Sequence, residues 1–192
     1  MFAWISMSLS GYSARLQPSG FRNVKYFTVL SNLFEALACI LFAVSVPLAK
    51  LRVFAETVKF AAAMCLMVTF SVVLLFLGPV FGFQGMYSNM LLFMHLVIPL
   101  ISFAEYLFFC RPHPHFLVTL LPVSAVVLYG SCYLINVIVN WTGEIPNPND
   151  FYGFASWGIV PGALLFILLC AATWGMSVLC RLLNRFLSAK IK

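Results

Sequence analysis

The sequence predicts an all-α fold, a polytopic membrane bundle of five transmembrane helices in a single domain over residues 1–192. Hydrophobic residues make up 63% of the 192-residue chain and charged residues only 8%, whereas the surface of a soluble domain needs far more charge. The mean hydropathy is +1.03. The apolar residues fall in long runs, each near the ~20 residues that a helix needs to cross a bilayer.

Each apolar run is followed by a break rich in proline or glycine, residues that end helices. Gly78-Pro79 closes the second run, Pro112 and Pro114 follow the third, and Pro146 and Pro148 follow the fourth. We therefore expect spans over residues 24–49, 58–80, 88–110, 116–140 and 154–179.

Residues 1–9 are apolar but too short to span a bilayer. They lack a basic leading region and a clear cleavage site, which argues against a cleaved signal peptide. Two interpretations stay open, an interfacial segment and a shortened sixth helix.

Lysine and arginine residues near the span ends predict the orientation, because cytoplasmic ends carry an excess of them. One side would hold eight and the other three, which predicts a cytoplasmic C-terminus and, with five spans, an N-terminal segment outside. The first group is Lys50, Arg52, Lys59, Arg111, Arg181, Arg185, Lys190 and Lys192, and the second is Arg15, Arg22 and Lys25.

The charge and the cysteines exclude several classes of function. The net charge of +6 comes from basic residues at the ends of apolar runs, where they serve topology and lipid headgroups, so we expect the bilayer as partner and no nucleic acid. The six cysteines form no C-x-x-C pair, which argues against a metal site or a disulfide framework. We expect no cofactor.

Polar residues recur at helical spacing inside three spans. Thr28, Asn32, Glu35 and Cys39 form one stripe, because residues three and four apart share a helix face. His95 shares a face of the third span with Ser88, Ser102 and Tyr106, with Glu105 adjacent, and Tyr129, Tyr133, Asn136 and Asn140 form a stripe on the fourth. Unsatisfied polar groups are costly in hydrocarbon, so we expect the three faces to meet in one interior.

Depth along the helices separates these residues into two groups. At 1.5 Å per residue, Thr28 lies ~6 Å and His95 ~10 Å below their helix starts. We expect one layer in the outer half of the bilayer, made of Thr28, Asn32, His95, Tyr133, Asn136 and Asn140. Glu35 and Glu105 lie deeper and form a second candidate cluster.

The residues around Thr28 and His95 resemble a known family. Residues 25–33, Lys-Tyr-Phe-Thr-Val-Leu-Ser-Asn-Leu, are similar to the "Y-x-T-x-x-(S/T)-N-L" helix of the androgen-induced-gene and ADTRP-like membrane proteins. They are still more similar to that of the family's bacterial six-helix relatives. His95-Leu-Val-Ile-Pro99 resembles the "H-x-x-x-P" helix, and Thr142-Gly143 followed by Pro146 a weaker "T-G…P" loop. Spacing and order agree over roughly residues 20 to 175.

The resemblance implies a multi-pass threonine hydrolase that cleaves fatty-acid esters of hydroxy fatty acids. Thr28 would be the nucleophile and His95 its base, since an alcohol needs a base to take its proton. An oxyanion could be stabilised by the polar groups that we expect to bind substrate, Asn32, Tyr133, Asn136 and Asn140. No Asp is placed to orient His95, so we expect a dyad acting on a membrane lipid ester.

Other interpretations of the same residues stay open. A membrane threonine commonly bonds to its own helix, and a membrane histidine can join helices structurally. The polar layer, with Glu35 and Glu105 beneath it, would also suit a transporter of a small solute or ion, or a lipid-binding membrane protein. The oligomeric state is left open.

Overall fold

The computed structural model describes residues 20–112, 115–140, 149–154 and 158–191. These residues form helices and connecting turns with no strand, so the prediction of an all-α fold is confirmed. Five helices are long and apolar enough to cross a membrane, which identifies an integral membrane protein. The N-terminal segment 1–9 and the Thr142-Gly143 loop lie outside the described residues.

The spans are built from helices joined end to end. A short helix, η1 (Gly20–Lys25), precedes α2 (Phe27–Ser45). The second span is α3 (Ala49–Val72), η2 (Val73–Leu77) and α4 (Gly78–Phe81), and the turn after it contains α5 (Phe83–Met86). The third is α6 (Met90–Leu92), η3 (Phe93–Val97) and α7 (Ile98–Phe109), the fourth η4 (Phe116–Leu120) and α8 (Leu121–Val139), and the fifth α9 (Ile159–Ile191).

Proline sets several of these ends. Pro47 follows the end of α2 and Pro112 the end of α7, because proline has no N–H with which to continue the helical hydrogen bonds. Pro122 lies in the first turn of α8, where its missing N–H costs no hydrogen bond. The second span begins at Ala49 rather than at residue 58, since its first turns hold charges that pair inside the protein.

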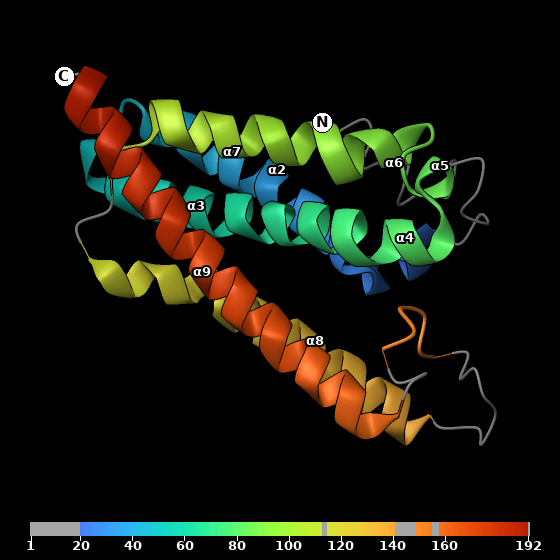
Figure 1. Ribbon diagram of the computed structural model, residues 1–192. Coiled ribbons are helices and arrows are strands. Elements are labelled where there is room, and N and C mark those ends of the chain that lie inside the picture. Colours follow the sequence, from blue (N-terminus) through green and yellow to red (C-terminus); the bar gives the residue numbers. More distant parts are fainter. Residues whose placement is uncertain (1–19, 113–114, 141–148, 155–157, 192) are drawn as a thin grey trace.

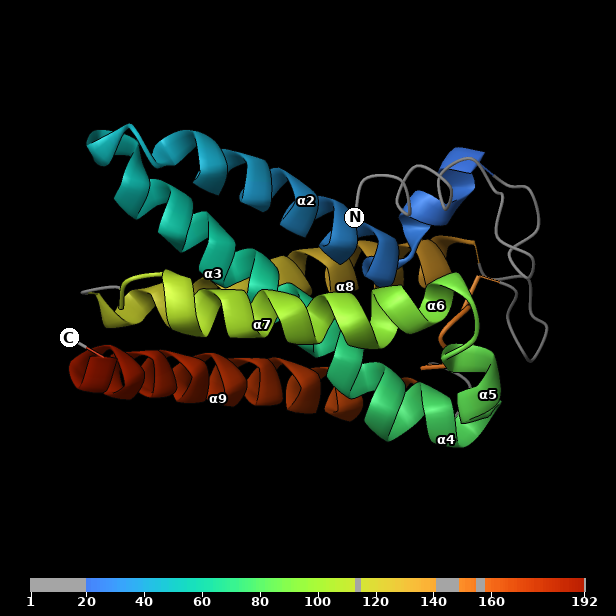
Figure 2. The ribbon, with the colours of Figure 1, turned by 90° about the horizontal axis from the view of Figure 1, so that it is seen from above.

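The helices form two groups (Figure 1). Helices α2, α3 and α7 lie together, and α8 and α9 form a second pair that diverges from α4 at one end of the bundle. Viewed from above (Figure 2), α2 and α7 lie close near α6 and separate toward the end of the bundle that holds the C-terminus. That end is called the C-terminal end below.

Helix α3 is the centre of the bundle. In the second span, which α3 begins, 67% of an apolar 18-residue stretch is buried, against 17% of the corresponding stretch of α9. Ala61, Ala62 and Ala63 are all buried, and such small residues let neighbouring helices approach closely. A buried apolar cluster joins α3 to α7 and α9, and its residues are Phe60, Ala63, Met64, Tyr106, Cys110, Val118 and Cys180.

Two π-helical turns interrupt the second and third spans at matching places. Each covers the positions six to two residues before a proline, Val73–Leu77 before Pro79 and Phe93–Val97 before Pro99. Proline has no N–H for the carbonyl four residues earlier and its ring crowds that carbonyl. At Pro99 that carbonyl belongs to His95, so the proline accounts for the wide turn in which the histidine lies. Such turns occur often at functional sites.

Candidate functional site

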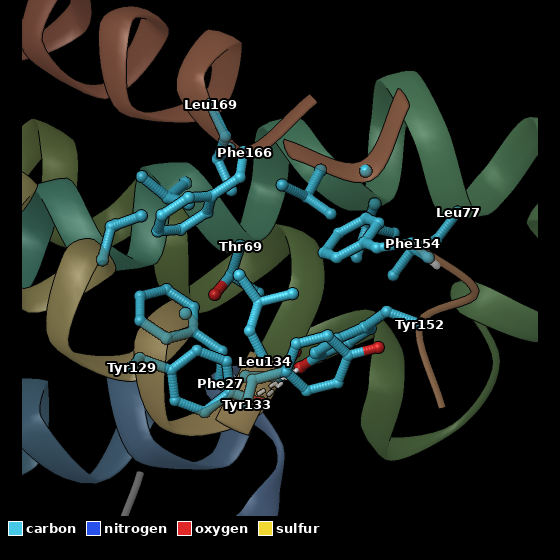
Figure 3. A pocket seen from close by; sticks show the side chains of 17 residues that line it. Phe27, Thr69, Leu77, Tyr129, Tyr133, Leu134, Tyr152, Phe154, Phe166 and Leu169 are labelled. Atoms are coloured by element: carbon cyan, nitrogen blue, oxygen red, sulfur yellow. Dashed lines mark hydrogen bonds between the residues drawn. The ribbon is translucent and has the colours of Figure 1, made fainter. Parts of the chain in front are cut away.

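Thr28 lies in the first turn of α2, on the wall of an apolar cavity of about 60 Å³ between α2, α3, α8 and α9. We call it the Thr28 cavity. Figure 3 shows its walls, with Phe166 and Leu169 of α9 on one side and Phe27, Tyr129 and Tyr133 on the other. Thr69 of α3 also lines this cavity, and the Thr69 hydroxyl lies 3.0 Å from the hydroxyl of Ser31. A hydroxyl in so apolar a space is shielded from bulk water.

A second cavity adjoins the first and shares three of its lining residues. It is a groove of about 710 Å³ between α2 and α8, lined by Leu30, Phe34 and Leu128 among others. Phe27, Tyr129 and Tyr133 line both cavities. The rings of Phe27 and Tyr129 lie 5.1 Å apart, so these aromatic residues form the partition between the two spaces. We call the second space the α2–α8 groove.

His95 is buried, with 5% of its surface exposed. Its ring Nδ1 lies 2.7 Å from the carbonyl oxygen of Met86, which belongs to the turn between the second and third spans. A carbonyl oxygen can only accept, so Nδ1 is the donor, and in the neutral ring Nε2 then carries the lone pair. This contact orients the imidazole as the aspartate of a catalytic triad does. The His95 ring is therefore held by a backbone carbonyl, a partner that the expected dyad did not include.

Asn32 connects the two helices that carry Thr28 and His95. Its side-chain nitrogen donates to the carbonyl oxygen of Thr28 at 2.8 Å and to that of Met94, next to His95, at 3.3 Å. The side chain is fully buried. Among the described residues, no hydrogen bond joins the Thr28 hydroxyl to the His95 ring. The structure thus links the two segments through Asn32 and leaves the two side chains unbonded to each other.

The other residues that we expected at the substrate lie in different surroundings. Tyr133 lines both cavities and its hydroxyl donates to Asp150. Asn136 lines the α2–α8 groove but is exposed, and Asn140 is exposed and donates to the side chain of Asn136 at 3.0 Å. Both donors of Asn32 are engaged by carbonyls, so Asn32 acts on position and cannot also stabilise an oxyanion.

Tyr152 is a residue of the site that the sequence did not reveal. Its hydroxyl accepts the N–H of Phe27 at 2.9 Å, directly before Thr28, and it lines the Thr28 cavity. Burial raises the pKa of Tyr152 above its usual value, so the phenol keeps its proton at neutral pH. Among the described residues, no carbonyl or carboxylate accepts this proton. No sequence motif marks Tyr152.

No family model, curated protein or solved structure matches this chain.

A cluster of charges is buried between α2, α3 and α7. The ammonium of Lys59 contacts Glu35, lies 2.7 Å from Oε2 of Glu105 and 3.0 Å from the sulfur of Cys39. Ser102 donates at 2.6 Å to Oε1 of Glu35, the oxygen that the Lys59 ammonium contacts. The expected second cluster of Glu35 and Glu105 is confirmed. Lys59 was expected at the end of a span, among the residues that set the orientation. In the structure it lies inside α3, and no part of its side chain is exposed.

The same cluster has the residue types of a metal site. One ligand atom from each of Glu35, Cys39 and Glu105 lies within 4.8 Å of the others. The Lys59 ammonium, however, contacts all three side chains. A cation of the protein itself therefore occupies the place that a metal ion would take.

Proposed function

We propose that this protein is an intramembrane hydrolase of lipid esters, with Thr28 as nucleophile and His95 as general base. The contact between His95 Nδ1 and the Met86 carbonyl carries the proposal, because it presents Nε2 as a proton acceptor. An alcohol is a weak nucleophile until a positioned base takes its proton. Support for Thr28 comes from its place on the wall of an apolar cavity, and Asn32 ties its helix turn to that of His95.

The reaction has two steps. Nε2 of His95 takes the Thr28 proton while the oxygen attacks the ester carbonyl, and the proton then passes to the departing alcohol, leaving an acyl-threonine. In the second step His95 takes a proton from water, which attacks the acyl group; the acyl–oxygen bond breaks, His95 returns the proton to the Thr28 oxygen, and the fatty acid leaves. The proposal places the Thr28–His95 contact in the substrate complex, since catalytic hydrogen bonds are often long before substrate binds.

Tyr152 is the oxyanion donor in this proposal. Its hydroxyl lies beside the backbone of Phe27, one residue from the nucleophile, and its proton faces only the Tyr129 hydroxyl, at a long 3.4 Å, among the described residues. Removal of one such donor typically costs ~3 kcal/mol of transition-state stabilisation. Tyr133 is less suited to this role, because Asp150 already accepts its proton.

The two cavities support a lipid ester as the substrate class. The Thr28 cavity is large enough for an ester group, and the α2–α8 groove beyond the aromatic partition is large enough for an acyl chain. Fatty-acid esters of hydroxy fatty acids, or esters like them, carry two chains that meet at the ester bond. We also propose that the C-terminal end of the bundle is cytoplasmic, since Lys50, Arg185 and Lys190 lie there.

The test is hydrolysis of a fatty-acid ester of a hydroxy fatty acid by the purified protein in neutral detergent, with both products measured by mass spectrometry. Thr28→Ala and His95→Ala should each lower the rate by ~100-fold or more. Thr57→Ala is the matched control, because the Thr57 hydroxyl bonds only to the carbonyl of Val53 in its own helix. Full activity in either site variant would exclude the mechanism.

A further inference from the structure

A groove on the lipid-facing side of the bundle lies between α2 and α7, which diverge toward the C-terminal end (Figure 2). Two adjoining cavities of about 310 and 770 Å³ form it, and both are lined by Ile101 and Glu105. The inner cavity also reaches Glu35 and Ser102, and the outer one reaches Arg52. We call the whole the α2–α7 groove; it is separate from the Thr28 cavity.

The inner part of the groove carries an unbalanced negative charge. Two carboxylates, Glu35 and Glu105, face the single ammonium of Lys59. Oε2 of Glu35 has no hydrogen-bond partner among the described residues, although only 1% of Glu35 is exposed and it lines the groove. A buried carboxylate oxygen without a donor is costly. Glu105 lines the groove and is one-third exposed, so its carboxylate is open to an added cation, with the covered Oε2 of Glu35 behind it.

The outer part of the groove holds the guanidinium of Arg52. Arg52 donates through Nε to Glu56 at 2.8 Å and stacks 4.1 Å from the ring centre of Phe42. A guanidinium has five donors, and a bond through Nε leaves those of its two outer nitrogens for an anion such as a phosphate. The groove therefore presents a cation at its mouth and a surplus carboxylate deeper along α7, beside the exposed apolar side chains of Ile101, Phe108 and Phe109.

We propose that the α2–α7 groove binds a phospholipid whose headgroup carries a primary ammonium, of the phosphatidylethanolamine type. The phosphate pairs with Arg52, the ammonium donates to Glu105 and reaches toward Oε2 of Glu35, and the acyl chains lie on Ile101, Phe108 and Phe109. Complementarity selects this occupant, since the outer donors of the Arg52 guanidinium and the exposed carboxylate of Glu105 line one cavity and match the phosphate and the ammonium of a zwitterionic headgroup. A bare metal ion fits less well, because the Lys59 ammonium already lies among its candidate ligands.

The test measures lipids retained by the purified protein, extracted in neutral detergent and analysed by native mass spectrometry. The probes are phosphatidylethanolamine, its monomethyl and dimethyl forms, and phosphatidylcholine, all with the same acyl chains. Retention should fall as N–H donors are replaced by methyl groups, with phosphatidylethanolamine held about tenfold or more tightly than phosphatidylcholine. This series uses the unaltered protein, so it does not depend on the folding of any variant.

Variants then assign the two ends of the headgroup. Glu105→Gln should lower phosphatidylethanolamine to the level of phosphatidylcholine, and Arg52→Met should lower both lipids, whereas Arg185→Met, at an exposed position of α9 that does not line the groove, should change neither. Equal retention along the methylation series would overturn the proposal, as would full retention by Glu105→Gln. Retention of dodecylamine as strong as that of phosphatidylethanolamine would overturn it too, because it would show that the phosphate contributes nothing.

Discussion

His95 donates through Nδ1 to the carbonyl oxygen of Met86 at 2.7 Å. Met86 ends the short helix α5 (Phe83–Met86), so the turn between the second and third spans sets the tautomer and the direction of the ring. The other ring nitrogen then has the form that a general base needs. A part of the chain without a chemical motif thus determines what the histidine can do.

Replacement of His95 by glutamine separates orientation from basicity. The glutamine amide can still donate to the Met86 carbonyl, so we expect a folded protein, but it has no basic nitrogen and hydrolysis should fall by ~100-fold or more. His115→Gln, an exposed histidine at the C-terminal end, is the matched control and should retain full activity. Thermal unfolding of both variants checks the fold, and an active His95→Gln would argue against the base.

Pro99 should matter for activity more than for stability. Pro99→Ala restores an N–H for the His95 carbonyl and so favours a regular α-helix in place of the π turn. The histidine would then rotate away from its present direction, and a shift of ~1 Å can cost ~100-fold in rate. We expect an unfolding temperature equal to or above that of the parent. Pro122→Ala, in the first turn of α8, should leave the rate unchanged; a fully active Pro99→Ala would show that the π turn is dispensable.

The charged cluster should respond strongly to removal of its cation. Lys59→Met leaves Glu35 without its ammonium partner inside the bundle and should cost ~3–5 kcal/mol of unfolding free energy. Combining it with Glu35→Gln removes the orphaned charge, so the double variant should be more stable than Lys59→Met alone. Unfolding in detergent measures the coupling. Additive losses would mean that the pair contributes no interaction energy.

The contact of α8 with α9 depends on a glycine. A Cβ built on Gly130 would lie 2.1 Å from the ring of Phe166, whereas one on Gly175 meets nothing within 4 Å. Gly130→Ala should therefore destabilise the protein by ~1–3 kcal/mol, and Phe166→Ala in the same chain should recover part of that loss. Gly175→Ala, an exposed helical position, should be neutral or stabilising by up to ~1 kcal/mol. Similar unfolding temperatures for both alanine variants would contradict this packing.

Much of the fold could be predicted because each membrane helix corresponds to a long apolar run in the sequence. The end of the second span at Phe81 and the bounds of the third and fourth spans, Met90–Phe109 and Phe116–Val139, lie close to the expected ends, since proline and glycine mark them. The start of α3 could not be predicted from hydropathy, because Arg52, Glu56 and Lys59 are charged and such residues are typical of segments outside the membrane. Their spacing of four and three residues places them on one helix face, and the structure shows that this face is turned inward.

The site was predictable only in part, for a similar reason. Single polar residues stand out in apolar runs, so Thr28 and His95 could be proposed as site residues from the sequence. The groups that contact these segments are not distinctive in sequence. One is the backbone carbonyl of Met86, which contacts the His95 ring, and another is Tyr152, which lies in a turn and accepts the N–H of Phe27. Asn136 and Asn140 share the helical spacing of Tyr133 but are exposed, because helical spacing does not say which face meets the bundle.

The most direct test of the central claim is the mass of the peptide that contains Thr28 after reaction with a long-chain fluorophosphonate, a probe that traps activated hydroxyl nucleophiles. The account predicts one adduct on Thr28, absent in His95→Gln and unchanged in Thr57→Ala. An adduct on another residue of an active enzyme, or ester hydrolysis that persists in Thr28→Ala, would contradict it.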